Sequence, residues 1–301
     1  MASLHINEFT EGVRTLMVGI RAKLGTKPDQ RMGIRSGFSE FDQRTRGFHE
    51  GKLYICGARP GVGKTSWATT LIANIAMSQP TVPILMFSTE LEEDEVLMQV
   101  IEAYAGAVPV YPNGRVSDAK EIEKLEAALT AVGQQVNECM LKVVHNRRLT
   151  VEFIDNTITQ FCDGILGGQS CFVIIDQASR IKREDKNKHG YALATEDMLN
   201  GLEVMAGKQN VPILLFSQAN RMTELQKHIT MANLKHSGAF EEFAHAVYLL
   251  EKDVDHGQRK PGDPRINYGA TVHIAKTRHG QIGPIDFHFF GESHTWREAA
   301  K

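Results

Sequence analysis

Short apolar runs alternate with helical stretches along the chain from Gly51 onward. The runs are rich in β-branched or aromatic residues and too short for helices of ordinary length, so the pattern predicts buried strands. Six predicted strands span residues 53–56, 84–87, 141–144, 172–175, 213–216 and 247–250, and two final ones span 271–275 and 285–289. Strands separated by helices predict an α/β fold, with a mostly parallel, twisted sheet flanked by helices on both faces.

The N-terminal part of the chain shows apolar positions at helical spacing from Ile6 to Leu24, followed by a polar break at 25–29. This pattern predicts an amphipathic helix and a linker over residues 1–31, in front of a larger domain over residues 32–301. The helix must bury its apolar face on its own domain or on a neighbour, and we favour its own domain. A polar segment with several Gly and Pro residues, 253–268, predicts an exposed loop before the final two strands.

Composition restricts the class of protein. Hydrophobic residues make up 42% of the 301 residues and charged residues 23%, as in soluble globular enzymes. The formal net charge of −2 means that any affinity for nucleic acid has to come from local basic loops. The four cysteines include no Cys-x-x-Cys pair, which favours buried, reduced thiols. Because the sequence shows neither a signal-peptide pattern nor an apolar stretch of roughly 20 residues, we expect a cytoplasmic protein without membrane contact.

A glycine-rich loop follows the first predicted strand and precedes a helical stretch. It reads Ala-Arg-Pro-Gly-Val-Gly-Lys-Thr over residues 58–65. Glycines in such a loop let backbone N–H groups turn toward phosphate oxygens, the lysine bridges the outer phosphates, and the threonine hydroxyl holds Mg²⁺. The sequence therefore predicts a site for ATP, or another nucleoside triphosphate, with Mg²⁺. The expected residues of this site are Arg59, Pro60, Gly61, Val62, Gly63, Lys64, Thr65 and Ser66.

Polar residues follow three other predicted strands, at the carboxyl edge where open α/β sheets bind ligands. Asp176 comes directly after an apolar run and is expected, with the loop threonine, to ligate Mg²⁺. Glu90 follows the second strand, where its carboxylate can orient and deprotonate the attacking water, or can belong to the acidic start of a helix at 92–95. Gln218 can hydrogen-bond the γ-phosphate, or can simply form a turn.

Several segments, in their order along the chain, resemble the conserved motifs in the C-terminal motor domain of DnaB-type replicative helicases. The specific part of this resemblance is the Ala-Arg-Pro form of the phosphate loop, the string Ser-Gln-Ala-Asn-Arg at 217–221 and the late Lys-Thr-Arg at 276–278. The other matching segments are 36–42, 51–53, 87–91, the strand that ends in Asp176, 237–242 and 275–280. The family's primase-interacting domain has no counterpart before residue 32, so we expect an excised motor domain or a compact natural version, such as one from a bacteriophage.

The resemblance implies a RecA-like P-loop NTPase core that assembles as a homohexamer and hydrolyses ATP between subunits. It implies movement 5′ to 3′ along single-stranded DNA, with unwinding of the duplex during replication. In this picture Lys276 and Arg278 reach into the neighbouring subunit's site, where Arg278 is the arginine finger that stabilises charge on the transferred phosphoryl group. Judged from the residues alone, a lysine and an arginine spaced in this way on a strand indicate only a face that is exposed to solvent. A primase and a helicase loader are the further partners that the family suggests.

Two basic segments are the candidates for DNA contacts in the channel of such a ring. They contain few aromatic residues, which suits a grip on the phosphate backbone with little sequence preference, although ordinary soluble loops can have the same composition. The candidates are Arg180, Lys182, Arg183, Lys186 and Lys188 after the strand that ends in Asp176, and Arg221, Lys227 and Lys235 after the strand that ends before Gln218.

Two other functions stay open from the sequence. The first is a non-motor module, a helicase-like loader or regulatory subunit that binds nucleotide and a partner. The presence of Glu90, Lys64 and Arg278 argues against it, because a purely structural descendant would be free to lose them. The second is a RecA-type recombinase or a clock-type ATPase with the same core, against which the 217–221 string and the late pair Lys276 and Arg278 argue.

Overall fold

The computed structural model describes residues 32–106, 108, 119–182, 186–219, 228–234, 237–252 and 267–300, the side chains of 186–192, 237, 267 and 268 excepted. The chain divides into two compact units, residues 1–33 and 34–301, and the larger unit carries every element named below. The predicted N-terminal helix at 6–24 lies outside the described residues, as does most of the predicted loop at 253–268.

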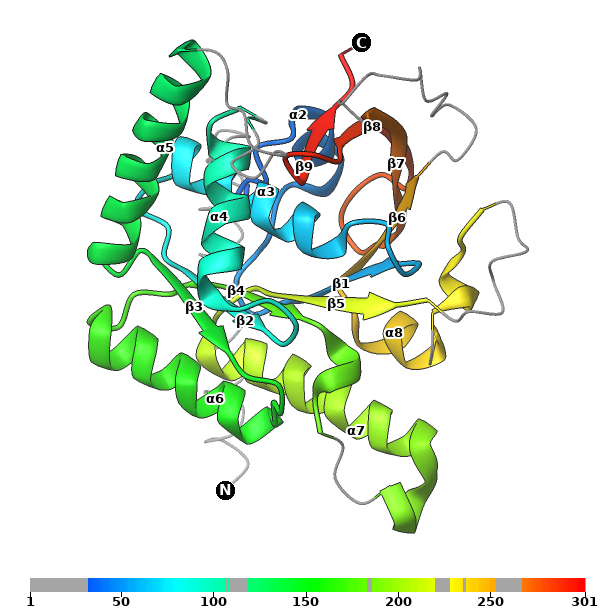
Figure 1. Ribbon diagram of the computed structural model, residues 1–301. Helices are drawn as coiled ribbons and strands as arrows, with labels where there is room; N and C mark the ends of the chain where they lie inside the picture. The colour runs from blue at the N-terminus through cyan, green and yellow to red at the C-terminus, as the bar shows by residue number, and fades with distance from the viewer. Residues whose placement is uncertain are drawn as a thin grey trace, which may run out of the picture. The chain divides into compact units, whose positions relative to one another are not determined.

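A mixed sheet of nine strands runs through the described part of the larger unit (Figure 1). The strands lie in the order β3-β2-β4-β5-β1-β6-β7-β8-β9, in which β1 to β6 run parallel and β7, β8 and β9 continue antiparallel. Their bounds are β1 Leu53–Ala58, β2 Ile84–Ser88, β3 Leu141–His145, β4 Phe172–Asp176, β5 Ile213–Gln218, β6 Ala246–Lys252, β7 Asn267–Thr277, β8 Gly283–Phe290 and β9 Thr295–Glu298.

All eight predicted strands are present, and each extends beyond its predicted range, which confirms the α/β fold. Two details differ from the prediction. The strand β7 begins at Asn267, so the last two residues of the predicted loop at 253–268 belong to the sheet. The short strand β9 was not predicted, because its four residues Thr-Trp-Arg-Glu contain a single apolar side chain and so show no apolar run.

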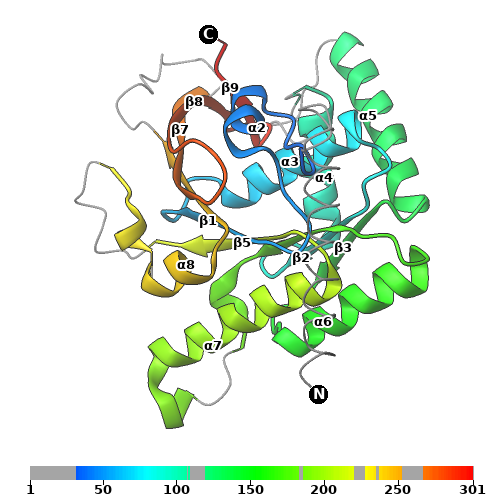
Figure 2. The ribbon, with the colours of Figure 1, turned by 180° about the vertical axis from the view of Figure 1, so that it is seen from behind.

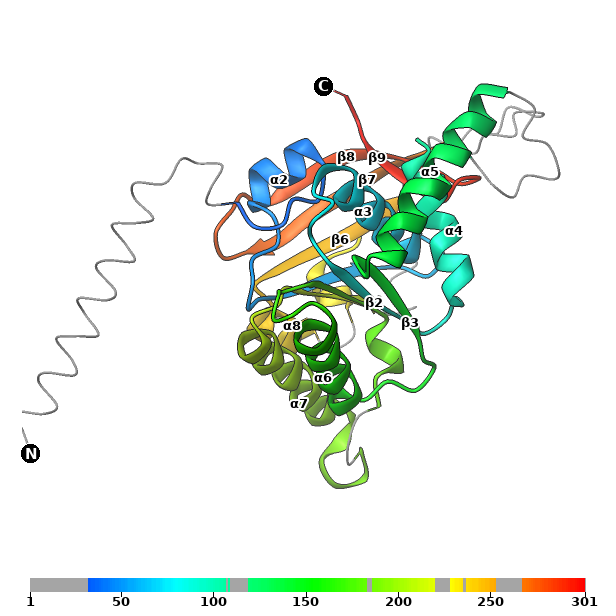
Figure 3. The same ribbon diagram turned by 90° about the vertical axis from the view of Figure 1, so that its left-hand side faces the viewer.

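Helices cover both faces of the sheet, as Figures 1 and 2 show from opposite sides. Seen from the side in Figure 3, one layer contains α2 (Ser39–Thr45), α3 (Lys64–Ser78), α4 (Glu93–Tyr104) and α5 (Ala119–Asn137). The opposite layer contains α6 (Val151–Thr159), α7 (Lys186–Gln209) and α8 (Ser237–Phe243). Short helical segments η2 (Gln160–Ile165), η3 (Ala178–Arg180) and η5 (Met231–Asn233) complete the connections. In the part of the chain that the structure describes, no helix combines the length and the apolar character needed to cross a bilayer.

Alternate strand residues enter two cores, one beneath each layer of helices. In β1, Tyr54 and Cys56 belong to the core under α3 and α4, whereas Leu53 and Ile55 belong to the core under α6 and α7. Because both faces are covered, the central strands are buried along almost their whole length and read as continuous apolar runs. Each large apolar side chain that is fully buried contributes about 1.5–3 kcal/mol to folding, so these cores are the main source of stability.

The helix α2 is held by residues from distant parts of the chain. The backbone N–H groups of Glu40 and Phe41, in its first turn, donate to the carboxylate of Glu298 in β9 at 2.9 and 3.0 Å. The ring of Phe41 is fully buried, with its centroid 4.8 Å from that of Tyr248 and 5.8 Å from that of Trp67. A helix of seven residues is too short to be stable alone, so α2 depends on these tertiary contacts.

Candidate functional site

The glycine-rich loop after β1 has the conformation that a phosphate-binding loop requires. Gly61 and Gly63 adopt left-handed φ angles of 71° and 101°, which only glycine takes up without strain. Gly63 is the N-cap of α3, so Lys64 and Thr65 begin a helix of 15 residues. The first backbone N–H groups of a helix have no partner within the helix, and the helix dipole favours an anion in front of them. The loop therefore presents donors and a partial positive charge at one point.

Two residues that the sequence did not single out brace this loop. The indole Nε1–H of Trp296, in β9, donates to the Gly63 carbonyl oxygen at 3.1 Å. The Lys252 ammonium, at the end of β6, donates to the Gly61 carbonyl oxygen at 3.1 Å and lies 3.9 Å from the centroid of the Phe289 ring. Burial lowers the pKa of Lys252 to about 8. Both contacts join residues about 190 or more positions apart, so no local sequence pattern could have predicted them.

A hydroxyl and a carboxylate meet beside the loop. The Thr65 hydroxyl donates to Asp176 Oδ2 at 2.5 Å, and Asp176 is the last residue of the buried strand β4. Burial raises the pKa of Asp176, while the Thr65 hydrogen bond and the Lys64 charge oppose that rise. Burial also lowers the pKa of Lys64, and the Asp176 carboxylate opposes this. Oxygen donors next to a phosphate-binding loop are the ligands that Mg²⁺ prefers, so Thr65 and Asp176 fit this ion.

Glu90 lies outside the helix that follows it. The helix α4 begins at Glu93, and Glu92 and Glu95 form its capping box, so the alternative that Glu90 belongs to the helix start is wrong. Instead the Glu90 carboxylate accepts a hydrogen bond from the Gln177 side-chain amide at 2.7 Å. Glu90 follows β2 and Asp176 ends β4, and these two strands are neighbours in the sheet. The two carboxylates therefore come from adjacent strand ends.

Gln218 completes the set at this edge. It is the last residue of β5 and pairs in register with Ala58, the last residue of β1, from which the phosphate loop departs. The prediction that the loop, Glu90, Asp176 and Gln218 converge on the carboxyl edge of the sheet is confirmed by the strand order and register. The roles predicted for these side chains are not tested by their position alone.

Lys276 and Arg278 lie toward the amino-terminal ends of the parallel strands, whereas their own phosphate loop follows the carboxyl end of β1. Lys276 is near the end of β7, where it pairs with Val247 near the start of β6, and β6 runs parallel to β1. Val247 pairs with Ile55 of β1, three residues before Ala58, so Lys276 lies about 10 Å along the strand direction from the start of the phosphate loop. Both side chains bind the end of α8: the Lys276 ammonium donates to the Glu241 carbonyl and, at 2.7 Å, to the Ala244 carbonyl, and the Arg278 guanidinium donates to the Glu242 carbonyl. Both cations are therefore engaged with the end of α8.

The predicted DNA-binding residues are only partly described. The Arg180 guanidinium, on η3, lies 3.5 Å from the Glu90 carboxylate, so it neighbours the candidate catalytic group. Lys182 is exposed, and its backbone N–H donates to the Leu149 carbonyl at 2.7 Å. The remaining candidates have no described side chain: Lys186 and Lys188 are in α7, and Arg183, Arg221, Lys227 and Lys235 lie outside the described residues.

Comparison with known proteins gives consistent matches over most of the chain. The replicative DNA helicase DnaC of Bacillus subtilis (strain 168) is 27% identical over 275 residues, covering 86% of this chain and 55% of that protein. The replicative DNA helicase DnaB of Haemophilus influenzae is 24% identical over 266 residues, covering 86% of this chain and 54% of that protein. The chain thus spans about half the length of the curated relatives that it matches.

Two solved structures share the fold. One, described as an ATPase domain, has a TM-score of 0.78 and 22% identity, covering 97% of this chain and 98% of the other. A DnaB-like replicative helicase, described with its interactions with primase, has the same TM-score and identity, covering 96% of this chain and 66% of the other. The sequence profile of the family described as "DnaB-like helicase C terminal domain" matches residues 33–298. The chain therefore belongs to the family of DnaB-like helicase C-terminal domains.

Proposed function

We propose that this chain hydrolyses ATP and uses the free energy to move 5′ to 3′ along single-stranded DNA as a homohexameric ring, unwinding duplex DNA during replication. The main support for the proposal is that the phosphate loop, the Thr65–Asp176 pair and Glu90 lie together at the carboxyl ends of the parallel strands. Membership of a helicase family supports the choice of DNA as the partner.

Each residue has a distinct part in the proposed reaction. The loop N–H groups and the Lys64 ammonium hold and orient the phosphates. Thr65 and Asp176 would hold Mg²⁺, which would neutralise phosphate charge. Glu90 accepts a proton from the attacking water, and its hydrogen bond from Gln177 fixes the carboxylate for that task. Gln218, one strand away from the loop, responds to the presence of the γ-phosphate and passes that difference to the segment that follows β5.

The catalytic cations come from a neighbouring subunit in this proposal. Lys276 and Arg278 contact the end of α8 and not their own phosphate loop, so in this proposal a second copy places its own loop beside them. Arg278 then stabilises the charge that develops on the transferred phosphoryl group, an effect of about 10³–10⁵ in rate for an arginine finger. Single-stranded DNA would lie against the basic residues that follow β4 and β5. A primase and a loader are proposed as partners of the complete protein.

The first test measures the ATPase rate against protein concentration, with and without single-stranded DNA. We expect the rate per subunit to rise with assembly and with DNA. Glu90→Gln should lower the maximal rate by about 10²–10⁴-fold, because it removes the general base while retaining the amide contact. Lys64→Ala should abolish turnover, whereas Lys142→Ala, an exposed lysine on β3, should match the wild type. A monomer with a rate independent of both concentration and DNA would favour a regulatory nucleotide-binding module.

The second test addresses the action between subunits. Arg278→Ala should bind nucleotide normally and lose turnover, and when doped into wild-type protein it should depress the rate more than dilution does. Arg148→Ala, at an exposed position, is the control and should leave mixed assemblies unaffected. If the mixed assemblies with Arg278→Ala lose activity only in proportion to dilution, the proposed role of Arg278 is wrong.

A further inference from the structure

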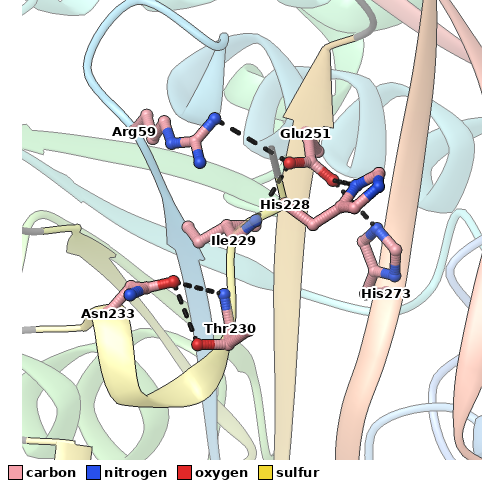
Figure 4. A network of polar contacts seen from close by, with 7 residues as sticks. All are labelled: Arg59, His228, Ile229, Thr230, Asn233, Glu251 and His273. Carbon is pink, nitrogen blue, oxygen red and sulfur yellow. Dashed lines mark hydrogen bonds and ion pairs between the residues drawn. The ribbon is translucent and has the colours of Figure 1, made fainter. Parts of the chain in front are cut away.

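Three metal-ligating side chains meet beside the phosphate loop, at a place outside the Thr65–Asp176 pair. His228 precedes η5, Glu251 is in β6 and His273 is in β7 (Figure 4). Glu251 Oε2 lies 3.2 Å from His228 Nδ1 and 3.1 Å from His273 Nε2. One ligand atom from each residue lies within 4.8 Å of the other two. Two imidazoles and one carboxylate thus converge from three separate segments of the chain.

The spacing of these atoms suits a tetrahedral ion. Zinc binds histidine nitrogen and carboxylate oxygen at about 2.0–2.2 Å, which puts neighbouring ligand atoms of a tetrahedral site roughly 3.4 Å apart. The two measured nitrogen-to-oxygen distances, 3.2 and 3.1 Å, are close to that value. The two histidine nitrogens need only a small closure, and the His228 side chain, which is 62% exposed, can rotate to provide it. The exposure of His228 also leaves a fourth position for water.

The surroundings of Glu251 orient its carboxylate for this task. The Glu251 side chain is only 7% exposed, and its Oε1 atom accepts the Ile229 N–H at 2.9 Å. The Arg59 guanidinium lies 3.8 Å from the same oxygen. These contacts occupy Oε1 and leave Oε2 directed between the two histidines, as Figure 4 shows. Outer contacts of this kind fix ligand orientation in known metal sites and tune their affinity.

The segment that carries His228 is itself held in a defined turn. The Asn233 side-chain oxygen accepts the Thr230 N–H at 2.6 Å and the Thr230 hydroxyl at 3.0 Å, which fixes the start of η5. A ligand on an ordered turn loses little conformational entropy on binding. The turn therefore positions His228 opposite the two strands before any ion arrives.

We propose that His228, Glu251 and His273 form a binding site for one divalent transition-metal ion, with zinc as the best fit to two imidazoles and one carboxylate. The site differs in chemistry from the all-oxygen pair Thr65 and Asp176, so excess Mg²⁺ does not compete for it. A bound ion ties the segment after β5 to β6 and β7. Glu251 also contacts Arg59 of the phosphate loop, so occupancy links that loop to the segment after β5. This proposal is independent of the proposed ATPase activity.

The test uses the tag-free 301-residue chain, saturated with Mg²⁺ and kept reduced, and titrates it with Co²⁺ as a spectroscopic substitute for Zn²⁺. We expect one equivalent to bind with the intense visible bands of a four-coordinate ion, and Zn²⁺ to displace it. His228→Ala should weaken binding more than about tenfold, and because His228 is exposed this variant should fold normally. His273→Ala and Glu251→Gln should behave alike. The melting temperature of the wild type, but not of the variants, should rise with Zn²⁺.

The matched control is His294→Ala. His294 Nδ1 lies 3.1 Å from the carboxylate of the buried Glu102, so it repeats one half of the cluster without a second histidine at hand among the described residues. This variant should bind Co²⁺ as the wild type does. The proposal is overturned if the wild type shows no four-coordinate bands, if His228→Ala and His273→Ala retain them, or if the spectrum shows cysteine-to-cobalt charge transfer, which would place the ion on a thiolate.

Discussion

His245 should make the protein lose stability in mild acid. This residue directly precedes β6, is 6% exposed, and has its ring centroid 5.4 Å from that of His279 and 5.5 Å from that of Tyr54. Burial, together with the nearby cationic groups His279, Lys52, His49 and Arg278, lowers its pKa from 6.5 to about 4. The folded protein therefore resists protonation at a position where the unfolded chain accepts a proton readily.

The sign and size of the effect follow from linkage. Above pH 6.5 the histidine is neutral in both states and costs nothing; between pH 6.5 and 4 only the unfolded chain gains the proton, so stability falls as pH falls. With 1.36 kcal/mol per pKa unit, the loss is about 2 kcal/mol by pH 5 and about 3 kcal/mol by pH 4. For a urea dependence of about 3 kcal/mol per molar, the loss at pH 5 moves the unfolding midpoint by roughly 0.7 M.

The assay is urea unfolding of the wild type and His245→Asn at pH 7, 6, 5 and 4. The difference in unfolding free energy between the two proteins should shift by the amounts above, because every other titrating group is common to both. His288→Asn, at an exposed position on β8, is the control and should follow the wild type at each pH. A constant difference between the wild type and His245→Asn from pH 7 to pH 4 would refute the reasoning.

Substitutions at the bracing contacts and at two glycines give further predictions. Trp296→Phe removes the indole donor to Gly63 while retaining an apolar ring, so it should cost about 1 kcal/mol and weaken binding of a non-hydrolysable ATP analogue; unchanged melting and affinity would contradict this. Gly280→Ala would place a Cβ atom 2.1 Å from the Arg44 carbonyl oxygen, so the backbone must shift at a cost of about 1–3 kcal/mol. Gly133→Ala, in the open interior of α5, should instead stabilise by up to about 1 kcal/mol. If urea denaturation shows that Gly280→Ala and Gly133→Ala change the free energy of unfolding in the same direction, these contacts do not govern the effects.

The parts of the fold that could be predicted from the sequence are those that depend on residues close together along the chain. The strands β1, β2, β4, β5 and β6 were recognisable because burial on both faces produces an almost unbroken apolar run, whereas in β8 apolar residues alternate with exposed ones. The phosphate loop was recognisable because its glycines and lysine lie within a few positions of one another. Asp176 was recognisable because it directly follows an apolar run, and Glu90 because it lies three positions after one. Each of these functional residues lies within a few positions of the strand that places it, so one short stretch of sequence shows both.

The rest depends on the order of strands in the sheet, which local patterns do not encode. The distance of Arg278 from its own phosphate loop follows from the antiparallel course of β7 beside β6. The cluster of His228, Glu251 and His273 escaped notice because its members are 22 or 23 residues apart on separate elements, with none of the short spacings typical of metal motifs. The interpretation of Arg180 as a DNA ligand likewise could not anticipate its position beside Glu90.

The bracing of the phosphate loop by β9 bears on when the site is completed as the protein is made. A ribosome releases the chain from its N-terminus, so the loop emerges early, whereas Trp296 follows Gly63 by 233 residues. Glu298, which binds the first turn of α2, is made later still. A nascent chain can thus form the strand and helix on either side of the loop long before the indole that fixes it exists. Nucleotide-binding geometry should accordingly be acquired only after most of the sheet has been translated.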